Sequence, residues 1–211
     1  MGQPYDPVEQ LRPLLADLGP GPALDIGFGD GETLVLLAEL GHGPLYGYEL
    51  SERQVEAARE RLRDTGAETR LYSEDATRLA AVPDASVDLV VVQNALQYFE
   101  VPALAAAVGR VLRRGGHLVG SVPHPGYYLH PRHLAALRRN WPPWWLLSYP
   151  RSALRSAIFA VTGRQPALGA SAREIGWSRR TVRRFARLAG MEVAEARPIG
   201  RGRLSVDLRR V

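Results

Sequence analysis

The chain has 211 residues, of which 45% are hydrophobic and 23% charged, and this is the composition of one ordinary globular domain. It has no cysteine, which excludes disulfides, cysteine-ligated zinc, iron–sulfur clusters and thiol nucleophiles. Residues 1–105 hold 7 arginines and 18 acidic residues, whereas residues 106–211 hold 20 arginines and 4 acidic residues. The basic second half is either a solvated surface or a cationic face that attracts an anionic substrate, nucleic acid or an acidic carrier.

The sequence contains no segment expected to enter a membrane. No stretch approaches the roughly 18 consecutive apolar residues that a bilayer span needs. The first six residues lack the basic start and apolar core of a signal peptide, and Asp6 stands where a myristoylation signal has Ser or Thr. We therefore expect a cytoplasmic protein.

Apolar runs and turn residues alternate as strand, helix, strand, helix over the first 125 residues. The pattern predicts strands at 23–26, 45–50, 69–72, 87–92 and 117–122, and helices at 32–40, 51–62 and 103–112. Ser51 and Gln54 have capping-box spacing, and residues 113–116 are expected to form a turn. Such alternation is typical of a doubly wound α/β fold with a parallel sheet covered on both faces.

The alternation stops after Pro123 for about fifty residues, and a connection that long usually has structure or function of its own. We expect an inserted helical cap over residues 127–177, with short helices near 131–139 and 151–161. All four tryptophans lie in it, Trp141, Trp144, Trp145 and Trp177, and they form either a pocket wall or the core of the cap. A helix capped by Ser178 and strands at 191–196 and 204–210 then complete a seven-stranded sheet in a single domain, 1–211.

A glycine-rich segment follows the first expected strand and reads Asp-Ile-Gly-Phe-Gly-Asp-Gly over residues 25–31. A dinucleotide fingerprint would need glycine in place of Glu32, and a P-loop would need a lysine, which the chain lacks. The D-x-G-x-G-x-G pattern resembles the first motif of the class I S-adenosylmethionine-dependent methyltransferases. The resemblance implies that five residues hold the methionine end of S-adenosylmethionine: Asp25, Gly27, Phe28, Gly29 and Gly31.

Three later segments extend this resemblance over residues 20–123 and imply a Rossmann-like fold. Glu49, with Leu50 beside it, matches the acid that accepts hydrogen bonds from the ribose hydroxyls. Asp75 and Ala76 match the motif that binds adenine, and Gln93 matches the end of the fourth strand beside the methionine moiety. The resemblance implies S-adenosylmethionine as cofactor and methyl transfer as activity.

The acceptor is expected beyond the fourth and fifth strands, where an open sheet binds its ligands. His124 is either a general base that takes a proton from the acceptor or a proline-flanked turn residue without a proton role. Tyr98 and Tyr127 are candidate substrate contacts, although an aromatic residue at either place is equally compatible with the core.

Missing motifs narrow the class of acceptor. The segment after the fourth strand lacks both the Asn- or Asp-Pro-Pro-aromatic motif of enzymes that methylate nucleic-acid bases and the paired acid of magnesium-dependent relatives. We therefore expect no metal, a small apolar or aromatic acceptor, and a monomer or homodimer. Two alternatives stay open. One is an RNA methyltransferase that uses the arginines of the helix at 178–189 (Arg179, Arg180, Arg183, Arg184 and Arg187), and the other is a non-catalytic S-adenosylmethionine-binding protein.

Overall fold

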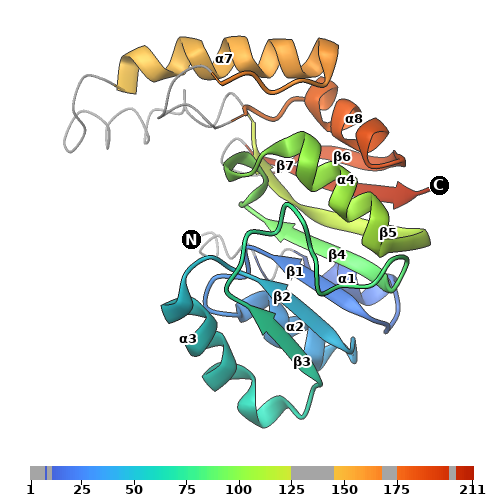
Figure 1. Cartoon of the computed structure of the whole chain (residues 1–211). Coiled ribbons are helices and arrows are strands. Elements are labelled where there is room, and N and C mark those ends of the chain that lie inside the picture. The colour runs from blue at the N-terminus through green and yellow to red at the C-terminus, as the bar shows by residue number, and fades with distance from the viewer. Residues whose placement is uncertain (1–7, 9–10, 125–144, 168–174, 200–202) are drawn as a thin grey trace, which may run out of the picture.

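Seven strands form one sheet in the order β3-β2-β1-β4-β5-β7-β6 (Figure 1). The computed structural model describes residues 8, 11–124, 145–167, 175–199 and 203–211, with only the backbone of 145–150. The strands are β1 (Ala23–Ile26), β2 (Leu45–Tyr48), β3 (Thr69–Tyr72), β4 (Val87–Gln93), β5 (Leu112–Pro123), β6 (Met191–Ile199) and β7 (Arg203–Arg210). The pairs from β3 to β5 are parallel, and β7 runs antiparallel to both neighbours. The predicted doubly wound, seven-stranded α/β fold is confirmed.

The helices cover both faces of this sheet. They are α1 (Arg12–Asp17), α2 (Glu32–Glu39), α3 (Glu52–Leu62), α4 (Val101–Val111), α7 (Trp145–Thr162) and α8 (Arg179–Leu188), with short turns η1 (Arg63–Thr65) and η2 (Leu96–Tyr98). Helix α1 was not expected from the sequence, and α7 packs against α8 beyond the β6–β7 end of the sheet (Figure 1). No helix in the part of the chain that the structure describes is both long and apolar enough to cross a bilayer.

Alternate side chains of the strands enter two separate cores, because successive residues of a strand point to opposite faces. Ala23 packs with apolar residues of α1, α2 and α3, whereas its neighbour Leu24 packs with residues of α4 and α8. Since both faces are covered, β1 and β2 are buried along their whole length. Their carboxyl ends emerge at one edge of the sheet, where the loops that follow can meet.

The structure corrects two local predictions. Residues 113–116 are not a free turn: β5 already begins at Leu112, and the extra residues are absorbed as a register shift against β4. Ser51 does precede α3, but its side chain forms no capping bond, and its backbone N–H donates instead to Glu49. The capping box occurs at the other predicted cap, where Ser178 and Thr181 bond each other's backbone N–H groups at the start of α8.

The segment predicted as a cap contributes one long helix to the described structure. The helix expected at 151–161 is α7, which begins six residues earlier, whereas the helix expected near 131–139 lies outside the described residues. Phe159 and Trp177 are buried in the core shared with α4 and α8, and Trp177 meets Phe185 edge-on at 5.9 Å between ring centroids. These two aromatics therefore serve packing. Trp141 and Trp144, and the side chain of Trp145, lie outside the described part of the chain.

Candidate active site

A cavity of about 700 Å³ opens at the carboxyl ends of β1, β2 and β4. The strand order reverses between β1 and β4, and open α/β sheets bind their ligands at such a switch point. Of the residues singled out from the sequence, those that line the cavity are Gly27, Gly29, Glu49, Leu50, Asp75, Ala76, Gln93 and Tyr98. The fold thus brings four separate sequence motifs to one place.

Asp25 lies in β1, two residues before Gly27, with Gly47 and Val91 as its partners on the neighbouring strands, and it is not itself among the residues that line the cavity. Its side chain is 1% exposed, and neither carboxylate oxygen has a hydrogen-bond partner among the described residues. Burial, with a smaller contribution from the charge of Glu49, raises the pKa of Asp25 to about 8. A buried carboxylate without donors is costly, and a cationic group placed against it would remove that cost.

Glu49 follows β2 and is held at the wall of the cavity by two backbone amides. Gly29 N–H donates to its Oε2 at 3.2 Å, and Ser51 N–H donates to its Oε1 at 3.1 Å. The first bond connects the glycine loop after β1 to the end of β2. The carboxylate therefore has a fixed orientation, and its remaining lone pairs are available to accept from a ligand.

The glycine loop combines a crowded position with an open one. Gly27 has φ +72°, and a Cβ there would lie 2.6 Å from the Cβ of Ala95, so no larger residue fits. Gly29 has φ +58° with open space around it, which lets a ligand approach the backbone closely. Phe28 points away from the cavity and is buried in the core beside Gly47, so it can offer a ligand only its backbone. Gly31 lies at the N-cap of α2, outside the cavity lining.

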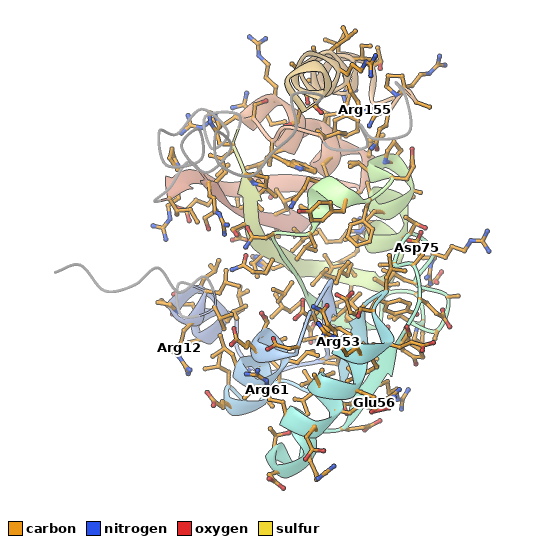
Figure 2. All side chains as sticks on the ribbon, turned by 90° about the vertical axis from the view of Figure 1, so that its left-hand side faces the viewer. Arg12, Arg53, Glu56, Arg61, Asp75 and Arg155 are labelled. Carbon is orange, nitrogen blue, oxygen red and sulfur yellow. The ribbon has the colours of Figure 1, made fainter. Side chains whose placement is uncertain are left out.

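The loop after β3 carries Asp75 and Ala76 to the same cavity. Asp75 Oδ1 accepts from Thr77 N–H at 2.8 Å, and Ala76 is buried in the core. Figure 2 shows Asp75 on the body of the molecule and Arg155, another residue of the cavity lining, on the helix above it. The cavity thus lies between the sheet edge and the α7 region.

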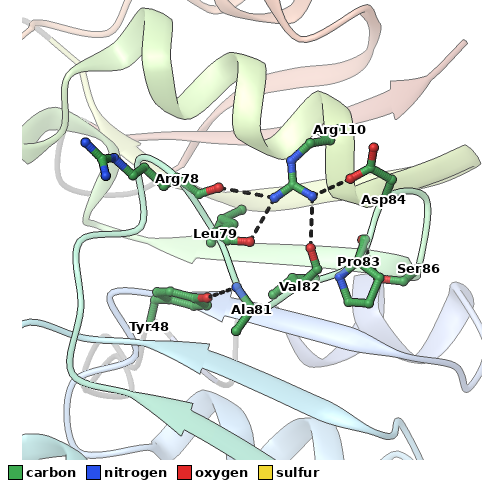
Figure 3. A network of polar contacts seen from close by, with 9 residues as sticks. All are labelled: Tyr48, Arg78, Leu79, Ala81, Val82, Pro83, Asp84, Ser86 and Arg110. Atoms are coloured by element: carbon green, nitrogen blue, oxygen red, sulfur yellow. Dashed lines mark hydrogen bonds and ion pairs between the residues drawn. The ribbon is translucent and has the colours of Figure 1, made fainter.

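One arginine holds the next segment of this loop in place (Figure 3). Arg110, near the end of α4, donates to the backbone carbonyls of Arg78, Leu79 and Val82 at 3.1, 2.8 and 2.9 Å, and forms an ion pair with Asp84. The hydroxyl of Tyr48 accepts from Ala81 N–H at 3.2 Å in the same network. This role was not predictable from the sequence, because an arginine on a helix is more often simply solvated.

Residues 24–120 match the family described as "Methyltransferase domain", and they contain all four motifs around the cavity. Residues 24–120 are therefore similar to a methyltransferase domain. The resemblance noted in the sequence implies S-adenosylmethionine as its cofactor.

The chain also resembles solved structures over nearly its whole length. A Pyrococcus horikoshii OT3 protein has a TM-score of 0.70 at 20% identity, covering 97% of this chain and 89% of its own. An S-adenosylmethionine-dependent methyltransferase from Mesorhizobium loti has a TM-score of 0.64 at 22% identity, covering 96% and 100%. The geranyl diphosphate C-methyltransferase of Streptomyces coelicolor A3(2) has a TM-score of 0.64 at 15% identity, covering 96% and 80%. At these identities the likeness is one of fold.

One sequence relative, an uncharacterized protein of Haemophilus influenzae, is 32% identical over 116 residues. The match covers 53% of this chain and 46% of that protein, so the chain matches less than half the length of this relative.

The residues of the methyltransferase domain fit its cofactor. The unpartnered, buried carboxylate of Asp25 suits the ammonium group of the methionine moiety, and the oriented Glu49 suits the ribose hydroxyls. Asp75 and Ala76, at the far side of the same cavity wall, suit the adenine. This division of roles stays a prediction that the binding experiments below test.

The rest of the lining, where we place the acceptor, comes from the segment after β4, from α7 and from the segment after α7. These residues are Asn94, Ala95, Tyr98, Phe99, Glu100, Arg155, Gln165, Pro166 and Ala167. Asn94 adopts φ +55°, and its carbonyl and side-chain oxygens accept from Gln97 and Ser121 at 2.6 and 3.1 Å. Strained backbone of this kind often occurs at functional sites. Apart from Tyr98, the sequence interpretation missed these residues, because no motif links a loop at 94–100 to a segment more than fifty residues later.

The remaining site predictions are not tested by this geometry. His124 follows β5 and is exposed, and it is not among the described residues that line the cavity. Tyr127 lies outside the described residues. Of the arginines on α8, Arg184 donates to the carbonyls of Ala160 and Val161 at the end of α7, so it is not part of a free basic stripe.

Proposed function

We propose that this chain transfers a methyl group from S-adenosylmethionine to a small-molecule acceptor bound at the Tyr98 end of the cavity. One observation carries the proposal: the carboxylate of Asp25 is buried and unpartnered, two residues before Gly27 of the cavity lining and near enough to the oriented Glu49 for the charge of Glu49 to raise its pKa. A single ammonium group would satisfy an acid that the fold alone leaves without a donor.

Bound S-adenosylmethionine supplies a methyl group on a positively charged sulfur. This methyl carbon would pass to the acceptor atom as the carbon–sulfur bond breaks, the electron pair of that bond would stay on sulfur, and an acceptor that bears a proton on that atom would release it to water. Such an in-line displacement requires chiefly that the two atoms be held about 3–3.5 Å apart. Asp25 and Glu49 fix the cofactor side of that distance, and the residues around Asn94 and Tyr98 fix the acceptor side.

The cavity supports a small acceptor. Its volume of about 700 Å³ is typical of small-molecule sites, and Tyr98 and Phe99 give the acceptor end an aromatic wall. The structural neighbour from Streptomyces coelicolor is a methyltransferase whose crystal structure holds geranyl diphosphate, which is a small molecule with an apolar chain. We therefore favour an acceptor with an apolar or aromatic portion.

Isothermal titration calorimetry with S-adenosylhomocysteine tests the cofactor half of the proposal. We expect a Kd near 1 μM, which corresponds to about −8 kcal/mol. Asp25→Asn and Glu49→Ala should each weaken binding about 10- to 100-fold, the range for a lost charge-assisted hydrogen bond.

Asp30→Asn is the matched control, because Asp30 belongs to the same loop but is half-exposed and pairs with Arg61 at 2.6 Å outside the cavity lining. It should bind S-adenosylhomocysteine like the wild type. Absence of binding by folded wild-type protein would contradict the proposed function.

A further inference from the structure

The acceptor end of the cavity contains a buried cation. Arg155 lies on α7, is 2% exposed and lines the cavity. Its Nε donates to the carbonyl oxygen of Pro166 at 2.9 Å, and Pro166 is itself part of the lining. The guanidinium is thus built into the wall, in contrast to the many exposed arginines of this half of the chain.

Further hydrogen bonds attach this wall to the methyltransferase domain. Gln165 Oε1 accepts from Val101 N–H at 2.7 Å, and Gln165 Nε2 donates to the carbonyl of Phe99 at 3.2 Å. On the other side, Ser156 Oγ accepts from Gly176 N–H at 2.8 Å. Hydrogen bonds therefore set the position of Arg155 relative to Tyr98 and Phe99. Some join residues close in the sequence, and others join residues more than sixty positions apart.

The charge of Arg155 is distinctive within the cavity. Among the described residues that line it, Arg155 is the single basic one, and three of the acids, Glu49, Glu74 and Asp75, come from the cofactor end. The fourth, Glu100, is exposed, and its Oε2 accepts from Ala103 N–H at 2.9 Å at the start of α4. The cavity therefore changes from acidic at the cofactor end to basic at the Arg155 wall.

We propose that Arg155 binds an anionic group of the methyl acceptor, a carboxylate or a phosphate, while Tyr98 and Phe99 contact its apolar portion. The planar guanidinium matches both anions with parallel hydrogen bonds, and a site shielded from water strengthens them. The acceptor is then an amphipathic acid. This inference rests on the proposed function, because it places the acid next to the cofactor in the same cavity.

Three matched pairs of probes test the charge preference: octanoate and octanamide, 3-phenylpropionate and its amide, and benzyl phosphate and benzyl alcohol. Each is titrated into wild-type protein saturated with S-adenosylhomocysteine. We expect at least one acid to bind about tenfold or more tightly than its neutral partner. The titration with S-adenosylhomocysteine comes first and separates the two proposals. If the wild type does not bind S-adenosylhomocysteine, the proposed function is contradicted. If it does, but then binds acids and neutral partners equally, only this inference is contradicted.

Arg155→Met and Arg155→Lys assign the preference to the guanidinium. Arg155→Met should abolish the acid preference without changing the affinity of the neutral partner, and Arg155→Lys should restore part of it. Arg151→Met is the matched control, because Arg151 lies one turn earlier on α7 and is exposed. The inference would be overturned if the wild type bound each acid and its neutral partner equally well, or bound none of the acids. It would also be overturned if Arg155→Met weakened both members of a pair to the same extent. The wild-type comparison stands even if Arg155→Met does not fold.

Discussion

The two ends of the cavity are built in different ways. The cofactor end consists of residues at or just after the carboxyl ends of the adjacent strands β1, β2 and β3, and its chemistry lies in acids at positions 25, 49 and 75. The acceptor end joins residues 94–100 to residues 155–167, and its fixed points are hydrogen bonds such as that between Gln165 and Val101. The first arrangement follows from strand order alone, whereas the second exists only when distant parts of the chain pack together. Disturbing each end should therefore have separable effects.

The largest expected effect concerns the charge of Asp25. Its pKa is raised from 3.8 to about 8, so between these values the folded protein retains a proton that the unfolded chain releases. The free energy of unfolding should therefore fall as pH rises through this window, by up to about 1.4 kcal/mol per pH unit. Asp25→Asn should remove this contribution, so that its stability exceeds that of the wild type near pH 8.

Urea denaturation of both proteins from pH 5 to pH 8 without ligand measures this difference. Parallel pH profiles for wild type and Asp25→Asn would show that Asp25 is already ionised and satisfied in the free protein. In the wild type, S-adenosylhomocysteine should also bind more tightly as pH rises toward 8, because ionised Asp25 is the form that attracts its ammonium group.

A smaller effect is expected from the crowded turn of the cofactor end. Gly27→Ala combines an unfavourable positive φ with a contact of 2.6 Å to Ala95, and should lower the free energy of unfolding by about 2–4 kcal/mol. Gly19→Ala is the control, because Gly19 has a similar φ of +71° but open space around it, and should cost only about 1–2 kcal/mol. Equal losses in urea denaturation would mean that the contact with Ala95 relaxes freely.

The Arg110 network should affect the adenine side of the cofactor. Arg110→Met leaves the loop at 78–84 without its four contacts, and we expect about tenfold weaker binding of both S-adenosylhomocysteine and adenosine, about 1.4 kcal/mol. Arg78→Met is the control, since Arg78 contributes its carbonyl to the network and its side chain is exposed. Methionine serves as a second probe in the same calorimetry. If Arg110→Met weakened the binding of methionine as much as that of adenosine, the substitution would have caused a general loss of structure instead.

The smallest effect is expected at the acceptor end. Gln165→Ala removes two bonds between the Arg155 wall and the start of α4, so the Val101 amide should exchange its hydrogen faster while S-adenosylhomocysteine binds as before. Arg164→Ala, at the neighbouring exposed position, should change neither quantity. A loss of cofactor affinity in Gln165→Ala would show that the two ends are not independent.

This contrast also decides how much the sequence could predict. The strand boundaries 23–26 and 69–72 were predicted without error, and Gly27, Glu49 and Asp75 were brought to one cavity as expected, because short periodic segments and loops after parallel strands follow local rules. The burial that raises the pKa of Asp25 was not predictable, since it depends on two neighbouring strands and the core around them. Arg155 was one of many arginines in the sequence, and only the packing of α7 distinguishes it.

Helix α4 contacts both ends of the cavity. Its first residue, Val101, bonds Gln165 of the Arg155 wall, and Arg110, one residue before its end, holds the loop that follows the adenine motif. An 11-residue helix is a rigid rod about 16 Å long. Because one helix carries both contacts, its length sets the separation between the Arg155 wall and the loop that follows the adenine motif.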